Sequence, residues 1–115
     1  MLELKDFEAA YNKVQEVVLP TKLIKSDYFS DQTGNDVYLK PENMQLTGAY
    51  KIRGAYYKIS TLSEEEKAKG LITASAGNHA QGVALAAARQ GVKATIVMPT
   101  TTPLLKAVSY THLTL

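Results

Sequence analysis

The order of short apolar segments after residue 70 constrains the fold more than any other feature of this sequence. Residues 71–74 are an apolar run typical of a strand, residues 79–90 an alanine-rich helix, and residues 94–98 a second strand that Pro99 ends. A strand, a crossover helix and a second strand predict a βαβ unit with two parallel strands. The expected fold is therefore α/β, a parallel open sheet with flanking helices.

Weaker patterns precede and follow this unit. They are apolar residues at helical spacing, turn residues before a short apolar run, and a capping box formed by Ser63 and Glu66. The expected elements are a helix at 4–18, a turn at 32–35, a strand at 37–39, a helix at 49–59, a short helix at 63–70 and a helix beginning at 100–103.

Composition excludes several functional classes. The 115 residues are 45% hydrophobic and 21% charged, as expected for a globular protein large enough for one small domain. The net charge is only +2 and the basic residues are scattered, so no nucleic-acid or membrane surface is expected. Cysteine is absent, and the N-terminus has no signal-peptide pattern. We expect a cytoplasmic protein that acts on a small molecule.

The loop between the first strand and the crossover helix is a candidate binding site. In open α/β sheets, ligands bind beyond the carboxyl ends of the strands, where helices begin. Ser75, Ala76, Gly77 and Asn78 are small enough for close backbone approach, and the following helix would direct free N–H groups at a carboxylate or phosphate. The alternative is an ordinary turn in which Ser75 or Asn78 caps the helix.

Other common catalytic and binding motifs are missing. There is no G-x-G-x-x-G fingerprint, and Val83 follows Gly82 where a phosphate-binding loop requires lysine. No G-x-S-x-G elbow is present. The two histidines, His79 and His112, have no second ligand at a suitable spacing, so no metal site is expected.

Lys51 differs from most other lysines in its surroundings. It lies between Tyr50 and Ile52, near the expected start of a helix. A lysine amine must be unprotonated to attack an aldehyde, and desolvation and the positive end of a helix both favour that form. The local context therefore suits Schiff-base chemistry, although a surface lysine with a packed aliphatic stem has the same pattern.

Two segments together resemble a known family. Residues 40–55 read KPENMQLTGAYKIRGA and residues 73–82 read TASAGNHAQG. They resemble the two motifs of the threonine/serine dehydratases, pyridoxal-phosphate (PLP) enzymes of the tryptophan-synthase-β fold type. The resemblance extends from about Leu19 to Lys106, and it identifies the fold as an incomplete tryptophan-synthase-β-like fold.

The resemblance implies a role for each residue of the two motifs. Lys51 would bind the cofactor as a Schiff base and then move the substrate α-proton. Asn78 would hydrogen-bond the ring hydroxyl of PLP, while Ser75, Gly77, Asn78 and His79 would surround the substrate carboxylate. The implied reaction is β-elimination from L-threonine, and possibly L-serine, giving the 2-oxo acid and ammonia, with the cofactor as electron sink. Such enzymes serve amino-acid metabolism, including isoleucine biosynthesis, and commonly form homo-oligomers.

Two residues depart from the family pattern and bear on which enzyme activity the chain would have. Ala49 replaces a common serine two residues before the lysine and keeps the space small. Ala76 stands where serine racemases carry a second acid/base serine, which favours a dehydratase. The alternatives are a racemase, a threonine synthase or a β-replacement synthase on the same scaffold, or a fragment without activity.

The resemblance also implies how the chain is divided. Residues 1–52 would belong to the large cofactor domain and residues 53–106 to the small α/β domain. Residues 107–115 depart from the family and are expected to be an unrelated tail. The family's glycine-rich phosphate loop is missing from these 115 residues, so we expect a truncated, inactive N-terminal piece of the enzyme.

Overall fold

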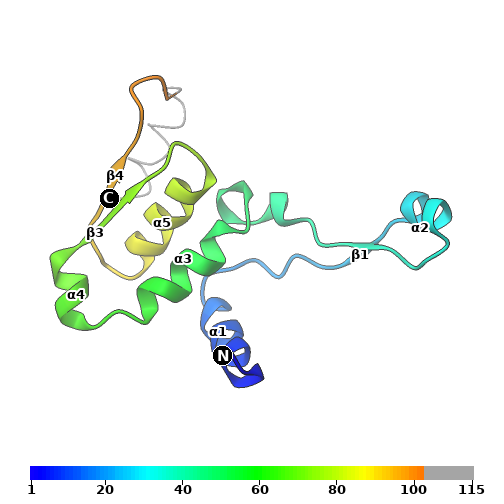
Figure 1. Ribbon diagram of the computed structural model, residues 1–115, viewed down its shortest axis with the longest axis horizontal. Coiled ribbons are helices and arrows are strands. Elements are labelled where there is room, and N and C mark those ends of the chain that lie inside the picture. The colour runs from blue at the N-terminus through cyan, green and yellow to red at the C-terminus, as the bar shows by residue number, and fades with distance from the viewer. Residues whose placement is uncertain (103–115) are drawn as a thin grey trace.

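The computed structural model describes residues 1–102, and two packed helices form its centre (Figure 1). α3 (Lys51–Ser60) and α5 (Asn78–Arg89) lie against each other and bury Ile52 completely. The face that α5 buries consists mainly of alanine and glycine, so the helices approach closely. The core cluster comprises Val17, Ile52, Ala55, Tyr56, Ile59, Val83, Ala86, Ala87 and Val92.

The expected βαβ unit is confirmed. β3 (Leu71–Ala74) and β4 (Ala94–Val97) pair in parallel, with Leu71 opposite Ala94 and Ala74 opposite Val97. α5 is the crossover between them, so the chain has the α/β class that the sequence predicts. One face of this two-stranded sheet stays open, because Ile72 is 76% exposed and Val97 51% exposed.

A capping box and two glycines set the ends of the helices at 64–69 and 78–89. α4 (Glu64–Lys69) begins with the predicted capping box, in which the Glu66 N–H donates to Ser63 Oγ and the Ser63 N–H donates to the Glu66 carboxylate. Gly70 and Gly91 follow α4 and α5 with φ values of +80° and +67°. A side chain would be strained at either glycine, so both helices end where the sequence indicates.

The first helix is shorter than its apolar pattern indicates. α1 (Leu4–Val14) ends four residues before the expected end, although turn-type bonds continue to Val18. Tyr56 on α3 ties this region to the centre, because its hydroxyl donates to Glu16 Oε2 at 2.8 Å. Val14 and Val17, which flank Glu16 in the sequence, are buried.

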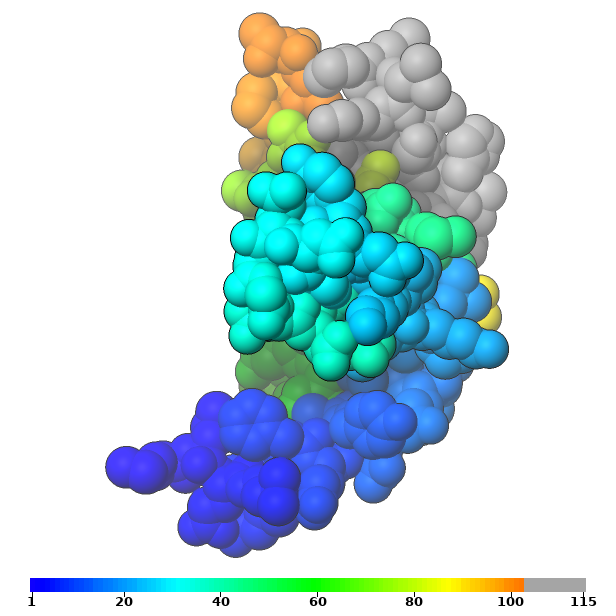
Figure 2. All heavy atoms as spheres, turned by 90° about the vertical axis from the view of Figure 1, so that its right-hand side faces the viewer, coloured from blue at the N-terminus to red at the C-terminus, as the bar shows by residue number. Residues whose placement is uncertain are grey.

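Residues 22–40 form a projecting arm, of which the sequence predicts only the turn at 32–35 and the strand at 37–39 (Figure 1). β1 (Ile24–Lys25) pairs antiparallel with β2 (Tyr38–Leu39), and α2 (Asp27–Thr33) joins them. Figure 2 looks onto the arm and shows α2 bulging in front of the rest of the molecule. The turn prediction for 32–35 was wrong in its first half, because Gln32 and Thr33 belong to α2 and only Gly34 takes the left-handed conformation.

The helix expected at 49–59 begins two residues later than predicted. Two short 3₁₀ turns, η1 (Glu42–Met44) and η2 (Leu46–Gly48), precede it, and α3 starts only at Lys51. Within the described residues, no helix is long and apolar enough to cross a membrane. Pro103, where the last expected helix would continue, and the tail at 107–115 lie outside the described residues.

Candidate cofactor site

Lys51 occupies the first position of the central helix α3. Its side chain is half-buried, and Nζ lies 5.2 Å from the centroid of the Tyr50 ring, a cation–π contact. The next residue, Ile52, is completely buried and fixes the start of α3 in the core. Lys51 is therefore held at its base by packed backbone, while its amine lies beside the exposed Tyr50 ring.

A strained turn delivers the chain to Lys51. Thr47 and Gly48 have φ values of +65° and +67°, and Ala49 then takes an extended conformation. The left-handed conformation costs a β-branched residue about 1–2 kcal/mol. The Thr47 Oγ1 atom is also buried without a hydrogen-bond partner among the described residues. Strain of this kind accumulates at functional sites, and here it lies four residues before the lysine.

Gln45 joins this turn to the segment that follows α1. It is 4% exposed, and its amide group accepts from the Leu19 N–H at 2.8 Å and donates to the Leu19 carbonyl at 2.9 Å. The same oxygen accepts from the Leu46 N–H at 2.9 Å. A buried amide with these partners holds the two distant segments in one register.

Glu42 and Arg53 form a second tie across the lysine. Arg53 Nε and Nη2 donate to the two oxygens of Glu42, each at 2.9 Å, and Thr21 Oγ1 donates to Oε1 at 2.7 Å. The Arg53 hydrogen bonds, with smaller help from Thr21 and Lys40, lower the pKa of Glu42 to about 2. The same hydrogen bonds raise the pKa of Arg53. This bidentate pair fixes the segment on both sides of Lys51.

The loop before α5 lies at the carboxyl end of the parallel strands. The Ser75 N–H donates to the Val97 carbonyl at 3.0 Å, and the Gly77 N–H donates to Ser75 Oγ at 3.2 Å. α5 begins at Asn78, so the N–H groups of its first turn have no acceptor within the helix. The predicted helix-start geometry is therefore present, and an anion placed there would meet backbone N–H groups and the positive helix end.

The packing of α3 against α5 brings the two motifs together. Gly82 lies directly against the backbone of Lys51 and Ile52. Asn78 is four residues, or about one turn, earlier on the same face of α5, which is about 6 Å along the axis. Lys51 and Asn78 thus occupy the same end of the helix pair. Ser75 and Gly77 immediately precede Asn78, and both are half-buried.

His79 points to a different part of this end of the molecule. It is exposed, and it borders a hollow of about 280 Å³ between α3 and β3, with Ala55, Ile59 and Val83 in the apolar wall. The structure therefore places His79 next to the loop but on the side of the α3–β3 hollow.

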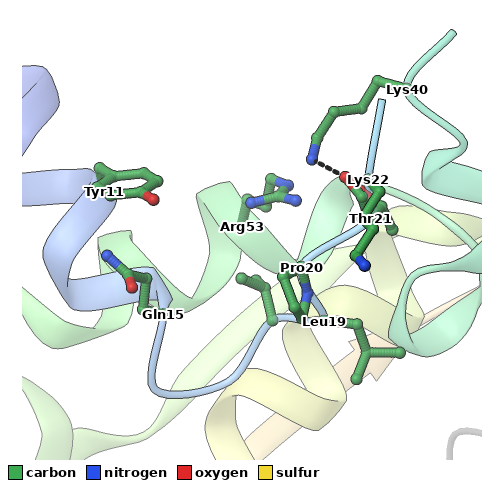
Figure 3. A pocket seen from close by; sticks show the side chains of 9 residues that line it. Tyr11, Gln15, Leu19, Pro20, Thr21, Lys22, Lys40 and Arg53 are labelled. Atoms are coloured by element: carbon green, nitrogen blue, oxygen red, sulfur yellow. Dashed lines mark hydrogen bonds between the residues drawn. The ribbon is translucent and has the colours of Figure 1, made fainter. Parts of the chain in front are cut away.

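A second hollow of about 340 Å³ lies beside α1 (Figure 3). Its walls are Tyr11, Gln15, residues 18–22, Lys40 and Arg53, and Lys40 Nζ donates to the Thr21 carbonyl across one side. Lys51, Ser75 and Asn78 do not line it. The hollow is therefore separate from the pair of motifs.

The comparisons with known proteins agree with this geometry. Residues 14–112 match the sequence profile described as pyridoxal-phosphate dependent enzyme. The chain belongs to this family. Its cofactor is accordingly pyridoxal phosphate, and its fold is that of the tryptophan-synthase-β type with incomplete sheets.

Three relatives define the similarity more closely. The L-threonine ammonia-lyase of Thermotoga maritima is 55% identical over 106 residues, which are 92% of this chain and 26% of that protein. Processed threonine deaminase isoform 2 from Solanum lycopersicum matches with a TM-score of 0.82 and 42% identity, over 97% of this chain and 32% of that one. The serine racemase of Dictyostelium discoideum matches with a TM-score of 0.91 and 33% identity, over 97% and 36%. The chain thus spans about a quarter to a third of their lengths.

The chemistry of the described residues fits pyridoxal phosphate. A lysine amine at a helix start can bind the aldehyde, and an amide side chain across the helix pair can hydrogen-bond a ring oxygen. The α5 N-terminus suits a carboxylate. Among the described residues, no cluster of three or more His, Cys, Asp or Glu side chains could hold a metal ion.

Sequence reasoning missed the residues that support Lys51. Glu42, Gln45, Thr47 and Arg53 all fall inside the recognised motif at 40–55, but no role was assigned to them. Membership of that motif was the available signal. Their spacing follows no helical or strand period, because they belong to two 3₁₀ turns and a helix start.

Proposed function

We propose that this chain is the N-terminal part of a PLP-dependent L-threonine ammonia-lyase. The observation that carries the proposal is the meeting of Lys51 and the Asn78 helix start at one end of the α3–α5 pair. The 55% identity to the Thermotoga maritima enzyme supports the same reaction class. Homo-oligomeric assembly and a cytoplasmic location are part of this proposal.

Each motif residue has one task in the proposed reaction. Lys51 Nζ binds the cofactor aldehyde and, once released, removes the α-proton of the bound amino acid. The Asn78 amide hydrogen-bonds the ring hydroxyl and sets the ring orientation. Ser75, Gly77, Asn78 and His79 surround the substrate carboxylate, which the N–H groups of the α5 start can bind.

The cofactor, when bound, supplies the electron sink that makes the α-proton removable. Loss of that proton and of the β-hydroxyl removes one water molecule from threonine. The enamine that leaves the enzyme takes up one water molecule and yields 2-oxobutanoate and ammonia. L-Serine would react in the same way and yield the corresponding three-carbon 2-oxo acid.

A racemase is the second candidate, because the Dictyostelium serine racemase has the higher TM-score of the two structures described above. Ala76 argues against it. Alanine cannot exchange a proton on the second face of the substrate, as a racemase requires. A threonine synthase or a β-replacement synthase would share the fold but require a different second substrate or leaving group.

We also propose that the 115 residues alone do not turn over substrate. The open face of the β3–β4 pair and the exposed aromatic residues of the arm, Tyr28, Phe29 and Tyr38, lack the cover that a complete enzyme would supply. The chain also spans only 26% of the Thermotoga maritima protein.

A graft tests the proposed function. The matched residues of this chain replace the corresponding part of the Thermotoga maritima L-threonine ammonia-lyase. We expect the graft to form 2-oxobutanoate and ammonia from L-threonine, and we expect neither D-allo-threonine from L-threonine nor D-serine from L-serine to accumulate. Lys51→Ala should abolish turnover, whereas Lys58→Ala, a matched change on an exposed position of α3, should not. A graft that is active with alanine at position 51 would refute the assignment of Lys51.

A further inference from the structure

Gly82 makes an unusually close contact between the two motif-bearing helices. A Cβ atom added at Gly82 would lie 2.9 Å from the Lys51 carbonyl carbon and 3.1 Å from the Ile52 nitrogen. It would also lie 3.1 Å from the Lys51 Cβ atom. Two of these three atoms are backbone, and the third is the first side-chain atom, so a rotamer change cannot relieve the clash.

The size of the displacement follows from ordinary contact distances. Carbon atoms in van der Waals contact lie about 3.5–4.0 Å apart. An alanine methyl group would therefore have to move the start of α3 by roughly 0.6–1 Å relative to α5. Gly82 is buried in the helix pair, so little space is available on its own side.

The rest of the helix pair resists a uniform shift. Beyond Gly82, the buried residues Ala86 and Ala87 of α5 pack in one cluster with Ile59 of α3. The later turns of both helices are thus locked in the core. An added methyl group at Gly82 would open the pair at the end that carries Lys51.

We infer that Gly82 is a positioning residue for the reaction. Its missing side chain sets the distance between Lys51 and Asn78, which lies one turn earlier on the same helix. This inference rests on the proposed function, because it assigns the contact a catalytic purpose. Displacements near 1 Å at reacting groups can lower rates by on the order of a hundredfold.

The test compares Gly82→Ala with a core variant of similar size in the graft described above. Ile59→Val removes one methyl group from the same helix pair, two turns away from Lys51, and serves as the control. For Gly82→Ala we expect kcat to fall between about tenfold and a hundredfold, with a smaller change in KM. The visible absorption band of the lysine-bound cofactor should also shift or weaken. Ile59→Val should leave kcat and the absorption band within about twofold of the unmodified graft. We expect this even if Ile59→Val lowers the thermal midpoint as much as Gly82→Ala does.

A nuclear Overhauser measurement on the 115-residue chain tests the Gly82 contact separately from the proposed function. The Gly82 α-protons should give a nuclear Overhauser contact to the Ile52 amide proton, which Gly82→Ala should weaken. If that contact is missing, or if Gly82→Ala retains full kcat and an unchanged band, the inference is overturned. If the contact is present but the graft shows no cofactor band that depends on Lys51, the proposed function fails instead.

Discussion

The Glu42–Arg53 pair gives the sharpest prediction about stability. Its hydrogen bonds to Arg53 lower the pKa of Glu42 from the usual 4.5 to about 2. One pKa unit corresponds to about 1.36 kcal/mol, so the full shift corresponds to about 3.4 kcal/mol. The Glu42 side chain is 19% exposed, and solvent screening reduces the contribution to about 2 kcal/mol.

The pH dependence follows from the direction of this shift. Because the folded-state pKa is lowered, the stabilisation is complete above pH 4.5 and is lost as the pH falls towards about 2. Glu42→Gln removes the charge at every pH. The difference in free energy of unfolding between the native chain and Glu42→Gln should therefore be about 2 kcal/mol at pH 7 and close to zero near pH 2.

Urea denaturation at a series of pH values measures this difference. Glu64→Gln is the control, because Glu64 also has a 2.8 Å ion pair, with Lys67, but its side chain is 91% exposed. We expect that control to change stability by less than about 0.5 kcal/mol at any pH. A Glu42→Gln difference that stays constant between pH 7 and pH 2 would refute the account of this pair.

Three further changes test the supports around Lys51. Gln45→Ala should cost about 2–3 kcal/mol in urea denaturation, because the part-buried hydrogen bonds of the Leu19 N–H and carbonyl to the buried Gln45 amide are lost. Gln32→Ala, on the exposed arm, should cost under about 0.5 kcal/mol. Thr47→Gly should raise the free energy of unfolding by about 0.5–1 kcal/mol by removing left-handed strain, and a loss would contradict that strain. Burial, and to a smaller extent the Glu16 hydrogen bond, raises the pKa of Tyr56 above 10.0. The stabilisation of the folded state by Tyr56 is therefore present below pH 10 and is lost as the pH rises further. Tyr56→Phe should remove this alkaline step in thermal unfolding.

The elements that local chemistry specifies were predictable from the sequence. The βαβ unit follows from two apolar runs on either side of an alanine-rich helix, and the Ser63–Glu66 capping box fixes α4. Gly91 ends α5 through its positive φ, as its position indicates. In each case a few adjacent residues determine the outcome, so tertiary contacts were not needed.

The arm and the turn before Lys51 depend on contacts between distant residues. α2 lies on a polar stretch without a clear apolar face, and none of its residues is buried. The late start of α3 reflects the Gln45–Leu19 and Glu42–Arg53 ties, which join residues 26 and 11 positions apart. Periodicity carries no information about such pairings.

The candidate site likewise has a part that the sequence predicts and a part that depends on contacts between distant residues. Lys51 and Asn78 came from motif resemblance, and the structure adds that one helix pair brings them to the same end. The close approach at Gly82 was not foreseen, because a glycine within a helix pattern indicates only lower helix propensity. The two-domain division at residue 52 stays a prediction; in the structure, α3 continues across that boundary.

The central claim is that Lys51 is the cofactor lysine, and site-resolved trapping tests it most directly. The graft is incubated with pyridoxal phosphate, reduced with borohydride, digested and analysed by mass spectrometry. The account predicts that the peptide containing Lys51 carries nearly all of the reduced cofactor, and that Lys58 on the same helix carries almost none. A label spread evenly over the exposed lysines, or retained in Lys51→Ala, would contradict it.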